Sequence, residues 1–153
     1  MTASPPAVTR ERWQVLCRLL GSAEARIERA LRTGHGVSAR EFALLDVLSR
    51  RHHDDGRPST RDLAHAIGLS HSATTRLMIR LEDRGLIRRS PCTADARRIR
   101  TRASDTGLAL ARQARHTHRA ALREALAEAA GDPHLAPVVR AVRDELERRV
   151  ATR

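Results

Sequence analysis

The middle of the chain carries two capped helical segments in quick succession, and this feature restricts the possible folds most. Ser59 or Thr60 is placed to begin the first segment, and Gly68 is placed to end it. Ser70 then begins a second segment, which Gly85 ends. Two short helices that follow each other so closely are typical of a helix-turn-helix.

After the second segment the hydrophobic period changes from helical to alternating. Residues 86–90 and 99–103 predict two short strands, and in the second one apolar or small side chains alternate with arginines. A polar loop joins them. Helix-turn-helix and hairpin together predict a winged helix-turn-helix over residues 37–103 of a single domain at 1–153. The fold class is therefore mainly α with a small β-hairpin wing.

A further helix opens this unit. Ser38 and Glu41 stand three residues apart, which is the spacing of a capping box. They predict the start of a helix that presents Phe42, Leu45 and Leu48 on one face.

Three more helices are predicted towards the ends of the chain. The first runs from about Thr9 to about Leu31, and a long helix follows the hairpin at about 105–130, opened by a serine cap. Asp132 as cap and Pro133 at the first helical position predict a last helix that runs to the end.

The terminal helices have apolar stripes that lie outside the compact winged helix. These stripes are Trp13, Leu16, Leu20, Ala23, Ile27 and Ala30 in the first helix and Leu135, Val139, Val142, Leu146 and Val150 in the last. A chain this small cannot cover them all, so we predict a homodimer through segments 9–33 and 105–151. In the alternative, these helices fold back on the winged helix of their own chain.

The charge of the chain favours a polyanionic partner. Arginine supplies all 29 basic residues against 18 acidic ones, which gives a formal net charge of +11. Residues 61–102 hold ten arginines and four acidic residues, so more than half of the net charge lies there. Double-stranded DNA is therefore expected to dock on this segment.

Composition also excludes several classes of protein. No apolar run approaches the ~18 residues of a membrane span, and the charged first thirty residues do not predict a secretory signal. Two cysteines, Cys17 and Cys92, are too few for a disulfide scaffold. A cytoplasmic protein is expected.

Six short motifs follow one another in a characteristic order and spacing. They are Asp62-Leu-Ala64, Leu69-Ser70-His-Ser72, Thr74-Thr-Arg76, Arg80-Leu-Glu-Asp-Arg-Gly-Leu-Ile87 with Arg89, Asp95-Ala-Arg-Arg98 and Ser104-Asp-Thr-Gly107. Together they resemble the MarR family of bacterial transcription regulators over about residues 20–110. The family usually has Leu-Thr where this sequence has Ala103-Ser104. The resemblance implies a homodimeric, nucleoid-associated repressor that binds a pseudo-palindromic operator and is released by a small ligand.

The second helix of the helix-turn-helix is the candidate recognition helix. Its hydroxyl groups suit phosphates or base edges, and an arginine can bind guanine with two hydrogen bonds. The candidate DNA-binding residues here are Ser70, Ser72, Thr74, Thr75, Arg76 and Arg80, with Ala73, Leu77 and Leu81 expected to face inward. Alternatively this is an ordinary solvated face, and Arg76 holds the winged helix together through an ion pair.

The loop between the strands is the candidate wing. Arg97 and Arg98 suit the negative potential of the minor groove, and Asp95 is placed to orient one guanidinium. In the family an arginine at one of these two positions enters the minor groove. A solvated charged turn is the alternative.

The resemblance further implies a crevice for a small, often phenolic, anion. Trp13, Arg76 and Arg89 match positions of a urate-responsive branch, whose acidic residue is replaced here by Ala43. We favour Trp13 as part of the dimer core. Cys17 resembles the reactive cysteine of a peroxide-sensing branch, which makes a thiol-based sensor an alternative, although a buried, inert thiol is expected.

No enzymatic activity, cofactor or metal is expected. The sequence has no phosphate loop, no nucleophile elbow and no acid–base pair. His52, His53, Asp54 and Asp55 are a weak surface cluster, and no histidine spacing closes a zinc shell. A nonspecific architectural DNA-binding protein is the remaining alternative.

Overall fold

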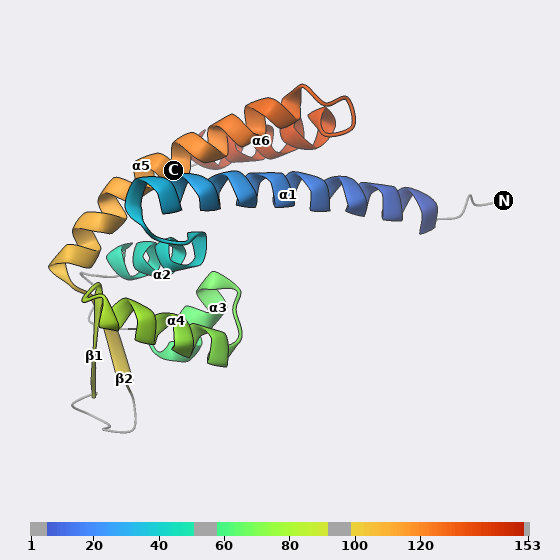
Figure 1. Cartoon of the computed structure of the whole chain (residues 1–153). Helices are drawn as coiled ribbons and strands as arrows, with labels where there is room; N and C mark the ends of the chain where they lie inside the picture. Colours follow the sequence, from blue (N-terminus) through green and yellow to red (C-terminus); the bar gives the residue numbers. More distant parts are fainter. Residues whose placement is uncertain (1–5, 51–57, 92–98, 152–153) are drawn as a thin grey trace. The chain divides into compact units, whose positions relative to one another are not determined.

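A computed structural model describes residues 6–50, 58–91 and 99–151. The chain divides into two compact units, one made of Met1–Ala30 with His118–Arg153 and the other of Leu31–Thr117. The elements in chain order are α1 (Pro6–His35), α2 (Ala39–Arg50), α3 (Thr60–Ile67), α4 (His71–Asp83), β1 (Ile87–Pro91), β2 (Ile99–Ala103), α5 (Asp105–Ala130) and α6 (Ala136–Ala151) (Figure 1). The predicted class, mainly helical with one antiparallel hairpin, is confirmed.

The second unit is built around one apolar core to which α2, α3, α4 and the hairpin all contribute. β1 lies against α4, while β2 lies against α2 and α3. Its largest fully buried side chains include Leu44 and Leu45 of α2, Leu63 of α3, Leu77, Met78 and Leu81 of α4, and Ile87 of β1. This arrangement is a winged helix.

Reciprocal capping fixes the start of α2, as predicted. The backbone N–H of Glu41 donates to Oγ of Ser38 at 3.1 Å, and the N–H of Ser38 donates to Oε2 of Glu41 at 2.7 Å. Within the first turn, Nη1 of Arg40 donates to the carbonyl oxygen of Ile67 at 3.0 Å. The start of α2 is thereby tied to the end of α3.

The predicted caps of α3 and α4 are also confirmed. Ser59 and Asp62 form a second capping box at the start of α3, and Gly68 ends that helix in the left-handed conformation at φ +65°. The side chain of Ser70 accepts a backbone N–H from the first turn of α4. Gly85, at φ +68°, follows the end of α4. Two caps and two glycines thus set the helix-turn-helix.

The hairpin begins one residue later than predicted. β1 pairs with β2 so that Ile87 lies opposite Ala103 and Arg89 lies opposite Thr101. Leu86 belongs to the preceding turn, because its N–H donates to the carbonyl oxygen of Leu81 at 2.9 Å, within the last turn of α4. That hydrogen bond keeps Leu86 out of the sheet.

The start of α5 packs tightly against this turn. Oγ of Ser104 accepts the N–H of Gly107 at 3.0 Å, as the predicted cap requires, and donates to the carbonyl oxygen of Gly85 at 2.6 Å. The N–H of Ser104 donates to the carbonyl oxygen of Leu86 at 3.0 Å. Ser104 therefore joins the end of α4, the hairpin and α5.

Side chains of α5 also hold α2 within the second unit. Nε of Arg115 donates to Oδ1 of Asp46 at 2.8 Å, and its Nη2 donates to Oγ of Ser49 at 2.8 Å. Two residues further on, Thr117 Oγ1 lies 2.7 Å from Nε2 of His35.

The first unit has a small core of its own. One buried cluster consists of Leu19 of α1, Ala129 of α5, Val139 of α6 and Leu135, which lies just before the first residue of α6. The last-helix stripe is thus covered in part by the same chain. Leu146 and Val150, which the prediction also placed in it, have side chains outside the described set.

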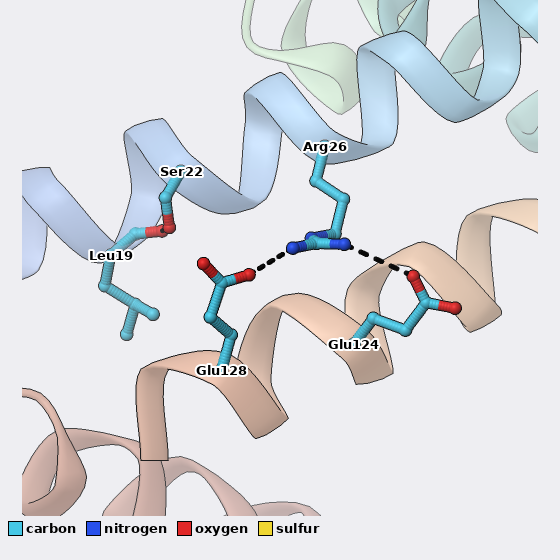
Figure 2. A network of polar contacts seen from close by, with 5 residues as sticks. All are labelled: Leu19, Ser22, Arg26, Glu124 and Glu128. Atoms are coloured by element: carbon cyan, nitrogen blue, oxygen red, sulfur yellow. Dashed lines mark hydrogen bonds and ion pairs between the residues drawn. The ribbon is translucent and has the colours of Figure 1, made fainter. Parts of the chain in front are cut away.

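One arginine links α1 to α5 on the surface of the first unit. Nη1 of Arg26 donates to Oε2 of Glu124 at 3.4 Å, and Nη2 pairs with Glu128 (Figure 2). The two carboxylates come from successive turns of α5. Because all three side chains are substantially exposed, the network contributes little stability.

Two predictions about the terminal helices are wrong in detail. α6 begins at Ala136, not at Pro133, because the carbonyl oxygen of Asp132 accepts the N–H groups of Leu135 and Ala136 and closes a separate turn. α1 is longer than predicted and runs from Pro6 to His35.

The predicted stripe of α1 is divided between two faces. Ala23 and Ile27 are buried, whereas Trp13, Leu16 and Leu20 are exposed to 64%, 38% and 59%. Leu19, one residue away from the predicted stripe, is buried instead. α1 therefore presents one apolar face to its own unit and a second apolar face outward.

Candidate nucleic-acid interface

The outward face of α4 carries four of the residues that the sequence assigned to DNA. Ser72, Arg76 and Arg80 are exposed, and Thr75 is half-buried. Oγ of Ser70, at the cap, lies 3.3 Å from Oγ of Ser72. The structure thus brings short hydroxyl groups and arginines together on one face of a helix.

Thr74 does not belong to this face. Its side chain is fully buried, and its hydroxyl donates to the carbonyl oxygen of Ser70 at 2.9 Å. Leu77 and Leu81 are buried as predicted, but Ala73, the third residue of the predicted inward face, is only half-buried, and Thr74 and Met78 complete the buried face instead. An internal hydrogen bond satisfies the hydroxyl, so a threonine fits the core side at little cost.

The two arginines of this face differ in their surroundings. Nε of Arg80 lies 3.9 Å from Oε1 of the buried Glu41. Within the described part of the chain, the side chain of Arg76 has neither a hydrogen bond nor an ion pair. The alternative in which Arg76 holds the winged helix together therefore has no support among these residues.

Arg84, at the end of α4, completes the surroundings of Glu41. Its Nη1 lies 3.5 Å from Oε1 of Glu41, and its Nη2 donates to the carbonyl oxygen of Gly36 at 3.0 Å. Glu41 therefore caps α2 and pairs with the C-terminal half of α4 at the same time. This carboxylate orients α4 relative to the start of α2.

A second ion pair joins α4 to the hairpin. Glu82 accepts the backbone N–H of Arg89 at 3.2 Å and its Nε at 2.5 Å. Hydrogen bonding to the Arg89 side chain holds the pKa of Glu82 below its ordinary value, against the opposing effect of burial. Arg89, a weak ligand candidate in the sequence, is engaged in fixing β1 to α4.

The outer face of the hairpin is strongly basic and includes Arg88, which was not among the predicted DNA-binding residues. Arg88 lies directly opposite Arg102, and Ser90 lies opposite Arg100. None of these three arginines forms an ion pair with a carboxylate that the structure describes. Like charges directly across a strand pair repel each other, so this face favours an anion. No alternation in the sequence marks Arg88, because its neighbours Arg89 and Ser90 are polar as well.

The predicted wing tip, Asp95, Arg97 and Arg98, lies outside the described residues, as does Cys92. The described strands end at Pro91 and resume at Ile99. The assignment of these side chains to the minor groove stays a prediction.

The other candidate residues are dispersed. Trp13 is exposed on α1, and Cys17, for which burial was expected, is exposed as well. The cluster from His52 to Asp55 lies outside the described residues. Over the part of the chain that is described, no group of three or more histidine, cysteine, aspartate or glutamate side chains is placed to hold a metal, and no helix has the length and apolarity needed to cross a membrane.

Comparisons with known proteins agree with this geometry. A sequence model of the MarR family matches residues 37–99. The HTH-type transcriptional regulator PecS of Dickeya dadantii (strain 3937) is 36% identical over 77 residues, which are 48% of this chain and 44% of PecS. The matched region is therefore less than half of that relative.

Solved structures share the fold over nearly the whole chain. AbsC, a MarR family transcriptional regulator from Streptomyces coelicolor, aligns with a TM-score of 0.73 at 22% identity and covers 98% of this chain and 99% of its own. CouR from Rhodococcus jostii RHA1, solved bound to p-coumaroyl-CoA, aligns with a TM-score of 0.65 at 28% identity and covers 86% of each chain. Residues 37–99 of this chain therefore match the MarR family, and the chain shares its fold with the MarR family regulator AbsC.

Proposed function

We propose that the protein is a sequence-specific DNA-binding transcriptional regulator that acts in the bacterial cytoplasm, on the nucleoid. One observation carries the proposal. The outward face of α4 presents Ser72 and Arg76 without a competing ion pair in the described residues, within the most basic segment of the chain. A helix of this composition, set by Ser70 and Gly85, suits the major groove.

Different basic residues contact the bases, the phosphates and the minor groove of the DNA. Arg76 is the base-reading arginine, because no described carboxylate competes for its guanidinium. Arg80, which Glu41 holds loosely, binds a phosphate. Arg88 and Arg102 bind phosphates beside the groove, and Asp95, Arg97 and Arg98 act as the minor-groove wing.

The regulator binds as a homodimer to a pseudo-palindromic operator. The outward face of α1, with Trp13, Leu16 and Leu20, is the support for this assembly. Val142 of α6 is also exposed, to 39%, in the same unit. Large apolar groups gathered in one unit favour an interface, and a two-fold dimer matches half-sites about one helical turn apart.

The regulator acts as a repressor that a small anionic ligand, such as a phenolic acid derivative, releases from DNA. The complex of CouR with p-coumaroyl-CoA supports this class of effector for the present chain. The exposure of Cys17 favours one alternative, a thiol-based sensor in which oxidation replaces the ligand.

The test is selection of binding sites from a random duplex library by the full chain, followed by affinity measurements on the selected site. We expect a two-fold consensus that binds at least ~10³-fold more tightly than bulk DNA. Arg76→Ala should relax the preference at one symmetric pair of positions. Arg123→Ala, at an exposed arginine of α5, makes the same charge change and should leave the preference intact.

An architectural protein would give a different result. It would enrich no consensus, and it would bind all duplexes with similar affinity. Equal losses for Arg76→Ala on every base-substituted site would show that Arg76 binds a phosphate and not a base.

A further inference from the structure

Ile79 is the exception on the polar face of α4. Its side chain is 42% exposed, although isoleucine gains free energy when it is buried. The other large hydrophobic side chains found exposed are Trp13, Leu16, Leu20 and Val142, all in the first unit. Among the described residues of the second unit, Ile79 stands alone in this respect.

Ile79 lies on the side of α4 opposite its buried residues, so its exposure is not that of a core residue at the edge of the buried face. At 3.6 residues per turn, Ser72, Arg76, Ile79 and Asp83 fall within about 60° of one another on the helix surface. The buried side chains of α4, Thr74, Leu77, Met78 and Leu81, lie on the opposite side. Ile79 therefore points away from its own unit, in line with Ser72 and Arg76.

The surroundings of Ile79 identify what it meets. Arg76, Arg80 and Asp83 are exposed around it, and the surrounding segment 61–102 holds ten arginines against four acidic residues, so a polyanion is the partner with complementary charge. In the major groove of DNA, base edges present hydrogen-bonding groups and one apolar group, the C5-methyl of thymine. A branched aliphatic side chain has no other base-edge group to pack against.

We propose that Ile79 is a specificity-determining residue that packs on the C5-methyl group of a thymine in each half-site. This inference rests on the proposed function and adds to it a base that Arg76 does not read. Removing one buried methyl contact should weaken binding about fourfold per half-site. The loss should depend on both partners, the isoleucine and the methyl group.

The experiment combines protein and base variants on the duplex selected from the random library. Each symmetric pair of thymines is replaced in turn by deoxyuridine, which lacks only the C5-methyl group. Wild-type, Ile79→Val and Ile79→Ala chains are measured on every duplex. Circular dichroism verifies that the variants fold, which the exposure of Ile79 favours.

We expect one symmetric pair at which deoxyuridine weakens wild-type binding by about fourfold per half-site but leaves Ile79→Ala unchanged. Ile79→Val should lose less than Ile79→Ala on the thymine duplex. Equal effects of every deoxyuridine on wild-type and Ile79→Ala chains would overturn the inference, as would a selected site without thymine. Either result leaves the proposed function standing, whereas failure to select any site would contradict both.

Discussion

A Cβ atom at Gly107 would lie 2.0 Å from the carbonyl oxygen of Leu86. The opposing atom belongs to the backbone of the turn that joins α4 to the hairpin, so no side-chain rotation relieves the clash. Glycine is required here for the close approach of α5 and not for an unusual backbone angle.

Gly107→Ala should therefore destabilise the second unit by about 3 kcal/mol, at the upper end of overpacking effects. The free energy of unfolding is measured by urea denaturation at fixed protein concentration. Gly21→Ala is the matched control, because no atom lies within 4 Å of a Cβ at that position in α1. There alanine should be neutral or stabilise the helix by up to about 1 kcal/mol. Equal behaviour of the two variants would contradict the close approach.

The stability contributed by the Glu82–Arg89 pair should depend on pH. The pKa of Glu82 in the folded state lies below its ordinary value of 4.5. The stabilisation is therefore complete above the unfolded-state pKa and is lost as the pH falls through the folded-state value. Glu82→Gln should cost about 1 kcal/mol at pH 7, and the cost should shrink as the pH falls below about 4.5.

The control for this pair is the next residue. Asp83 is exposed, and its side chain forms no hydrogen bond or ion pair with another described residue. Asp83→Asn should change the free energy of unfolding little at either pH. A cost of Glu82→Gln that stays constant from pH 7 to pH 3 would refute the ionic origin of the effect.

Two buried threonines should respond in opposite ways to the same substitution. Oγ1 of Thr101 is buried and has no hydrogen-bond partner in the described structure, whereas the hydroxyl of Thr74 donates to Ser70. Thr101→Val should be neutral or stabilise the protein by about 1 kcal/mol, and Thr74→Val should destabilise it by a similar amount. Thermal unfolding of both variants measures these changes. If both substitutions destabilised the protein, or both stabilised it, this assignment of hydrogen-bond partners would be contradicted.

A charge on the outward face of α1 should separate the proposed dimer. Leu20→Glu places a carboxylate where both copies contribute apolar surface, and loss of two buried leucines should raise the dimer dissociation constant roughly 100-fold. Sedimentation velocity over a concentration series measures this change. Ile79→Glu, at an exposed isoleucine in the other unit, should leave the dissociation constant unchanged. Monomeric wild-type protein at micromolar concentration would refute the dimer itself.

Removal of Arg88 should affect folding and DNA binding in opposite directions. Arg88→Ala relieves repulsion from Arg102 and should stabilise the free protein by about 0.5 kcal/mol. The same variant should bind DNA more weakly, and the slope of log affinity against log salt should fall by about 1. Arg112→Ala, on an exposed site of α5, should leave the slope unaltered.

Local rules predicted the elements of the winged helix, because caps and stop signals act within a few residues. Ser38 with Glu41, Ser70 and Gly68 all occupy the predicted positions. The wrong or missing predictions concern contacts that the hydrophobic periodicity of the sequence does not reveal. Thr74 is buried because an internal hydrogen bond satisfies its hydroxyl, and Arg88 faces Arg102 because of a register set by the hairpin.

The candidate site was predictable where residue type and helical phase agree, as at Ser72 and Arg76. It was not predictable where a side chain has a choice of partners. Arg89 is attractive as an anion ligand in the sequence, but its neighbour Glu82 becomes visible only when α4 and β1 are placed side by side. The difference between Arg76 and Arg80 likewise depends on Glu41, which is distant in the chain.

His35 lies near the start of the second unit, which begins at Leu31, and Thr117 is its last residue; Nε2 of His35 lies 2.7 Å from Oγ1 of Thr117, although 82 positions separate them. The polypeptide therefore enters and leaves this unit at neighbouring points. Domains whose termini lie close together tolerate insertion into another protein, because the two flanking segments of the host chain need not separate. The winged helix of this protein therefore has the end-to-end geometry that insertion between two helices of an unrelated scaffold requires.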